Sequence, residues 1–158
     1  MSTNVSTGYV TSILGQGLTF ASLFQDGCIE IRSGEQPPSA DQAATGDLLA
    51  RITRDGVAWA AGSQAGGLRF KLAGRWVSKD PSHTWRIVGM AEGTATWCRL
   101  VANAFDDGAA SYDLPRIDGA VGPLDATGDV QLYLPSTEIL PSTEIAVEQW
   151  LYAIPPLE

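Results

Sequence analysis

The chain has 158 residues, the length of one ordinary domain, and its 44% hydrophobic and 18% charged residues exclude a disordered chain. Its net charge of −8 argues against nucleic acid, which is bound by basic surfaces, and against an anionic membrane surface, which attracts polybasic segments.

Residues 1–27 are predicted to form an irregular, partly helical arm. Leu14 and Leu18 have helical spacing, but Gly15 and Gly17 each weaken a helix by about 1 kcal/mol. The segment has no basic stretch followed by an apolar one, and no run in the chain approaches the roughly 20 apolar residues of a bilayer span. We therefore expect neither a signal peptide nor a membrane segment, and synthesis in a cytoplasm.

Alternating apolar and polar residues predict a series of short strands after the arm. The predicted strands cover residues 29–32, 48–53, 68–72, 85–87, 94–101, 116–121, 130–134 and 145–154. Each should turn one face to a core and the other to water. Glycine- and proline-rich turns separate them, including a long loop over residues 35–46. The expected fold is all-β: a single antiparallel, jelly-roll-like β-sandwich or barrel over residues 28–158.

The final predicted strand is apolar on both faces, which a solvated outer face does not explain. Either a loop of the chain or another subunit should cover it, since exposed apolar patches mark contact surfaces. The same reasoning applies to the apolar residues of the arm. The candidate interface residues are Leu14, Leu18, Phe20, Phe24, Trp150, Tyr152 and Ile154.

One internal repeat is identical in both copies: LPSTEI occupies residues 134–139 and again 140–145. Proline followed by serine and threonine favours local turns, so residues 134–145 are predicted to form an extended loop. Loop insertion costs little closure entropy, which explains the duplication without a function. An adhesive tip is the alternative.

Few residues suggest chemistry. The one histidine, His83, follows Asp80 and Ser82, but triad members rarely lie this close in sequence, so a polar turn is expected. Cys28 and Cys98 fit no metal-binding spacing and are expected to be reduced, buried thiols. We predict no catalytic residue, no metal ligand and no cofactor.

Calcium is the one metal that irregular acidic loops could hold. The aspartates concerned are Asp106, Asp107, Asp113, Asp118, Asp125 and Asp129. They form no recognisable calcium-loop pattern, so solvated acidic turns are the expected alternative.

Several short segments resemble a loose family of small virion proteins from tailed bacteriophages. They are IEIRSGEQPP at 29–38, LLA at 48–50, GTATWCRL at 93–100, RIDGAVG at 116–122 and DVQL at 129–132. The resemblance implies a structural role in the particle, no catalytic residue, and the major capsid protein or other virion proteins as partners. The arm and the doubled LPSTEI stand outside the family pattern.

The leading hypothesis is a non-enzymatic virion protein, assembled in the host cytoplasm, that stabilises the head as a capsid decoration or cement subunit and self-associates. A tail, baseplate or fibre component is the first alternative. A carbohydrate-binding β-sandwich is the second, favoured if Trp59 and Trp76 prove exposed and side by side. An esterase or glycosidase is disfavoured by the single histidine.

Overall fold

The computed structural model describes residues 3–74, 76–147 and 150–153. Strands make up 35% of the chain and helices 10%, which confirms the predicted all-β class. The helical part lies at the N-terminus, as expected for residues 1–27.

The main layer is a large sheet of eight strands among the described residues. Its strands are β1 (Asn4–Val5), β2 (Cys28–Arg32), β3 (Leu48–Arg54), β6 (Trp85–Gly89), β8 (Trp97–Val101), β9 (Arg116–Pro123), β10 (Leu132–Leu134) and β12 (Glu144–Ala146). They follow the order β1-β9-β8-β2-β3-β6-β12, and β10 pairs with β9. Every pairing is antiparallel except that of β10 with β9, which is parallel.

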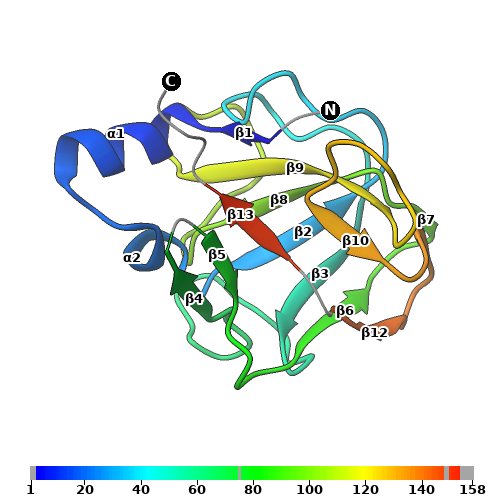
Figure 1. Ribbon diagram of the computed structural model, residues 1–158. Helices are drawn as coiled ribbons and strands as arrows, with labels where there is room; N and C mark the ends of the chain where they lie inside the picture. The colour runs from blue at the N-terminus through cyan, green and yellow to red at the C-terminus, as the bar shows by residue number, and fades with distance from the viewer. Residues whose placement is uncertain (1–2, 75, 148–149, 154–158) are drawn as a thin grey trace.

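Two smaller sheets and two helices complete the fold. They are β4 (Phe70–Ala73), β5 (Trp76–Lys79) and β13 (Leu151–Ala153) in one sheet, β7 (Gly93–Thr94) and β11 (Glu138–Ile139) in the other, and the helices α1 (Thr7–Gln16) and α2 (Phe20–Phe24). The sheet β13-β5-β4 lies over one face of the large sheet, with α2 beside it (Figure 1). This arrangement has two layers, and the large sheet does not close on itself into the barrel that was one predicted form.

Most of the predicted strands correspond to observed ones. The predicted strands 68–72, 85–87, 94–101 and 130–134 overlap β4, β6, β8 and β10. The predicted strands 29–32, 48–53 and 116–121 match β2, β3 and β9 closely. The predicted strand 145–154 is wrong as one element, because the chain forms β12 in the large sheet and then β13 in the small one. The prediction missed β5 altogether.

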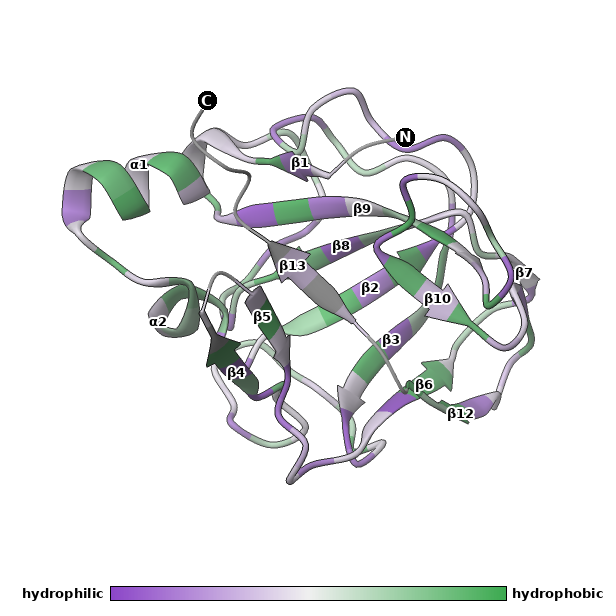
Figure 2. Cartoon of the chain, viewed as in Figure 1, coloured by the Kyte–Doolittle hydropathy of each residue, from purple (hydrophilic) through white to green (hydrophobic). Residues whose placement is uncertain are grey.

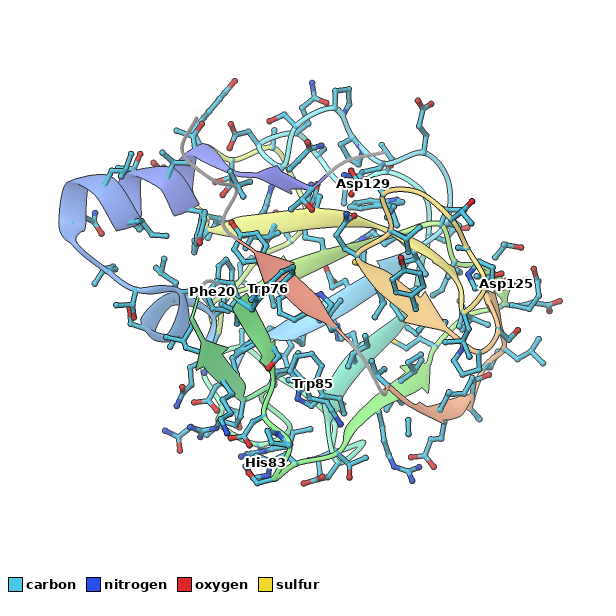
Figure 3. All side chains as sticks on the ribbon, in the orientation of Figure 1. Phe20, Trp76, His83, Trp85, Asp125 and Asp129 are labelled. Atoms are coloured by element: carbon cyan, nitrogen blue, oxygen red, sulfur yellow. The ribbon has the colours of Figure 1, made fainter. Side chains whose placement is uncertain are left out.

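The core fills the space between the two layers. An aromatic cluster joins them: Phe70 packs edge-on against Trp85 at 5.3 Å between centroids, and Phe20 stacks on Tyr152 at 5.6 Å. Phe20 and Trp85 are both labelled in Figure 3. Phe20 and Phe24 in α2 are buried in this cluster, together with Tyr9 of α1. The described part of the predicted arm, residues 3–27, is therefore not separate but contributes to the same core as the strands that follow it.

The opposite face of the large sheet is also buried, although its side chains are charged. Residues two apart share a face, so Glu30, Arg99 and Asp118 lie side by side across β2, β8 and β9. The alternation of hydrophilic and hydrophobic residues along β9 is visible in Figure 2. Glu30 is 6% exposed, and Arg99 and Asp118 are fully buried. The prediction that these strands turn one face to water is wrong here.

Loops cover this charged face and are bound to it by hydrogen bonds. The Arg99 guanidinium donates to both carboxylate oxygens of Asp118, at 2.7 and 2.8 Å, and to the carbonyl of Gln42. The Arg116 guanidinium likewise makes a bidentate pair with the Asp106 carboxylate, and it also donates to the carbonyl of Ala109. These contacts hold the loops 33–47 and 102–115 against the sheet.

The two LPSTEI copies do not form an extended loop, which corrects that prediction. The first ends in β11, which pairs with β7, and the second ends in β12, which pairs with β6. Leu134 of the first copy is fully buried, whereas the equivalent Leu140 of the second is 54% exposed. The copies therefore form two neighbouring edge strands.

Candidate interaction surface

The first 25 residues contain no Asp, Glu, Lys, Arg or His, so every charged side chain of this acidic protein lies at or after Asp26. In the structure the uncharged segment forms β1, α1 and α2. Helix α1 protrudes at one side of the molecule (Figure 1). The acidic molecule therefore has one segment without charged side chains.

The N-terminal end of α1 is bound to the rest of the molecule, and its C-terminal end is capped. Ser6 is the N-cap, and its hydroxyl accepts the Tyr9 amide and donates to the carbonyl of Leu114. Thr7 donates through its amide and its hydroxyl to the Asp41 carboxylate, each at 2.7 Å. Gly17 ends the helix in the left-handed conformation, with φ 66°. This anchoring gives the exposed face of α1 a defined position.

The close approach of α1 to the body requires a glycine. A Cβ on Gly8 would lie 2.4 Å from the carbonyl oxygen of Asp113, which is backbone and cannot rotate away. Tyr9, the next residue, points into the core, and burial first, then the neighbouring Tyr152, raises the pKa of its phenol. The inner side of α1 is thus permanently covered.

The outer side of α1 carries apolar side chains in contact with water. Leu14 is 80% exposed, and Val10 and Leu18 are each 39% exposed. Val10 and Leu14 are four residues apart and lie on one helix face. Leu18 follows the end of the helix, directly after Gly17. We call the three exposed residues Val10, Leu14 and Leu18 the α1 face. No charged residue of α1 interrupts it.

The candidate interface residues divide into two groups. Leu14 and Leu18 are exposed on the α1 face. Phe20, Phe24, Trp150 and Tyr152 are buried in the chain's own aromatic cluster, so the expectation that they contact another subunit is wrong. The final strand was expected to be covered either by the chain itself or by another subunit, and the structure shows that the chain itself covers it. Ile154 lies outside the described residues.

The sequence contained a signal for the α1 face that apolar periodicity does not use. The absence of charge over residues 1–25 is visible in the sequence and marks the same surface. Periodicity instead selected Phe20 and Phe24 together with Leu14 and Leu18, because it cannot tell which apolar residues the rest of the chain covers.

The predicted polar turn around His83 is confirmed. Asp80 accepts the amide and the hydroxyl of Ser82, at 2.9 and 2.6 Å, and these hydrogen bonds lower the pKa of its exposed carboxyl. Asp80 thus binds the serine directly rather than orienting the histidine, as a triad would require. Figure 3 shows His83 at the edge of the molecule, away from Phe20 and Trp76.

Cys28 and Cys98 are buried, as predicted, and do not meet. Cys28 shares the charged face with Glu30, whereas Cys98 pairs with Ile31 and faces the core. Burial raises the pKa of both thiols, that of Cys98 to about 12. Both are therefore protonated at neutral pH, and a protonated thiol is a poor nucleophile.

Several of the aspartates considered for calcium have other partners. Asp118 and Asp106 bind arginines, and Asp129 accepts from the Gln131 amide at 2.6 Å. Asp125 and Asp129 are labelled in Figure 3. Within residues 3–74, 76–147 and 150–153, no three His, Cys, Asp or Glu side chains are grouped as metal ligands.

Trp59 and Trp76 do not form the sugar platform considered from the sequence. Trp59 is half-buried in the loop after β3, where the Arg51 guanidinium lies 5.7 Å from its ring centroid. Trp76 begins β5 in the other layer and is 52% exposed. No ring contact joins the two in the part of the chain that the structure describes.

Comparisons of the chain with family models, with curated proteins and with solved structures find no match. The resemblance to phage virion proteins thus remains an expectation from the sequence. No helix within the described residues is long and apolar enough to cross a membrane.

Proposed function

We propose that this chain is a non-enzymatic structural protein of a phage particle, and most specifically a capsid decoration subunit that docks through the α1 face. The observation that carries the proposal is an exposed apolar surface without charge on a molecule with a net charge of −8. Acidic bodies repel one another, so an uncharged face is the part that can approach a neighbour closely.

The chemistry of the face defines the partner surface. Val10, Leu14 and Leu18 offer apolar area without fixed charge, so the partner should present an apolar groove on the capsid. Burial there contributes roughly 25 cal/mol per Å², multiplied over the symmetric copies of a shell. Because no ion pair contributes to this contact, its strength should change little with salt.

The location is tested by separating purified particles into heads and tails and measuring this chain against the major capsid protein by mass spectrometry. Hundreds of copies in heads are the expected result. A few copies in tails would replace decoration with a role in the tail, baseplate or fibre. Absence from both fractions would overturn the virion proposal.

The surface is tested with Leu14→Asp, and Leu140→Asp is the matched control. Both leucines are exposed, so both variants should fold, but only the first places a charge on the α1 face. We expect L14D to lose binding to particles that lack this chain and L140D to keep it, as measured by co-sedimentation. Equal binding of the two variants would show that α1 is not the docking surface.

A further inference from the structure

A small pocket lies on the charged side of the large sheet, over β3 and β6, and it does not involve the α1 face. Its volume is about 190 Å³, below the roughly 300 Å³ at which drug-sized sites begin. It therefore suits a ligand of about ten non-hydrogen atoms. The lining residues are Arg51, Thr53, Ala58, Trp59, Val88 and Met90.

Two hydrogen-bond donors of the lining have no partner. Thr53 is 2% exposed, and its Oγ1 makes no hydrogen bond with any described residue. The Nε of Arg51 is buried without a partner in the same part of the structure. The two residues are two apart on β3 and point to the same side of the sheet. Unpaired buried donors cost free energy that an acceptor would recover.

Arg51 shares its acidic partner with a second arginine. Glu30 is the acidic partner of both Arg51, at 3.7 Å between Nη2 and Oε2, and Arg32, at 3.5 Å. Glu144, another carboxylate on this side of the sheet, lies two strands away from Arg51, opposite Val88. Glu30 thus serves two guanidinium groups, and Arg51 can bind a further anion.

The rest of the lining is apolar and held in place. The Trp59 indole N–H donates to the Asp26 carbonyl at 2.8 Å, which fixes the ring against the Arg51 guanidinium. Val88 pairs with Arg51 across β3 and β6, and Met90 stands half-exposed at the rim. A ligand body that fills this space should be apolar.

We propose that this pocket binds a small carboxylate with an apolar body, its oxygens accepting from Arg51 Nε and Thr53 Oγ1. Such a group occurs in a free organic acid and at the C-terminus of a protein chain that ends in an apolar residue. The inference is independent of the capsid role, because it uses none of the residues of the α1 face.

Titration followed by the Trp59 indole N–H signal in NMR spectra tests the site, with benzoate as probe and benzamide as its uncharged counterpart. We expect benzoate to bind with a dissociation constant on the order of 1 mM, as fragment-sized ligands do, and benzamide at least about tenfold more weakly. N-acetylphenylalanine and its amide repeat the comparison for a chain terminus. No shift with either acid, or equal binding of acids and amides, would overturn the proposal.

Thr53→Val tests the donor without endangering the fold, because the hydroxyl has no partner to lose and the side chains have similar shapes. We expect benzoate binding to weaken about tenfold, the loss of roughly one hydrogen bond to a charged group. Thr11→Val, an exposed threonine on α1, should bind like the unmodified chain. Unchanged binding by T53V would refute the assignment, whatever the particle experiments show.

Discussion

The two faces of the large sheet are both buried across β2, β8 and β9, but they are stabilised in different ways. The inner face packs Ile29, Ile52 and Leu100 against the second layer, and stability there comes from apolar area. The outer face buries Arg99 against Asp118 beneath loops, so it depends on complete pairing of charges. The comparison teaches that alternation of apolar and polar residues shows that a strand has two chemically different faces. It does not show whether the polar face is exposed to solvent.

The largest expected effect comes from leaving one buried charge without its partner. Asp118→Ala strands the Arg99 guanidinium and should lower the free energy of unfolding by about 3–5 kcal/mol. Ile52→Val on the inner face should cost only about 0.5–1.5 kcal/mol. Urea unfolding measures both. The double variant Arg99→Met with Asp118→Leu should regain most of the loss, and its failure to do so would show that the pair itself stabilises the fold.

Leu134 and Leu140 occupy the same position in the two identical hexapeptides, so they show the effect of burial in the same local sequence. Leu134→Ala removes a buried side chain and should cost about 2–5 kcal/mol, whereas Leu140→Ala, at an exposed site, should cost less than about 0.5 kcal/mol. Thermal unfolding of the two variants measures the difference. Equal losses would contradict the assignment of the two copies to different environments.

The smallest of the three effects depends on pH. Burial alone would raise the pKa of Asp106, but hydrogen bonds from Arg116 and the Gly108 amide outweigh it and lower the pKa below the ordinary 3.8. A carboxyl with a lowered folded pKa stabilises the fold above its ordinary pKa and loses that contribution as the pH falls below about 3.8.

Asp106→Asn should therefore cost about 1.5–3 kcal/mol at pH 7 and flatten the loss of stability below pH 3.8, measured by urea unfolding across that range. Asp118 should not add to the loss of stability at acid pH, because burial raises the pKa of Asp118 more than Arg99 lowers it. If D106N lost stability below pH 3.8 as steeply as the unmodified chain, the pH dependence would belong to other carboxyl groups.

The sequence predicted the parts of the fold that depend on local pattern. Alternation located β2, β3 and β9, while β5, only four residues long, has too few for a clear period. The parallel pairing of β10 with β9 and the change of layer between β12 and β13 depend on distant partners, which local pattern does not contain.

The candidate sites were less predictable than the strands for the same reason. Backbone carbonyls of the covering loops bind Arg99 and Arg116, and any residue type supplies a carbonyl. The unpaired Thr53 hydroxyl is likewise a property of the packed structure, since nothing in the residues around it marks the missing partner. The uncharged N-terminal segment is the exception, because composition alone reveals it.

The doubled hexapeptide also bears on how such a protein can lengthen. A turn separates the two strands: the Thr143 amide donates to the Leu140 carbonyl, and Ser142 is in the left-handed conformation. In both copies the glutamate, Glu138 or Glu144, is exposed and the following isoleucine is at least partly covered. A duplication of six codons could thus add an edge strand in a single genetic event, because the second copy carries both the turn and the strand that follows it.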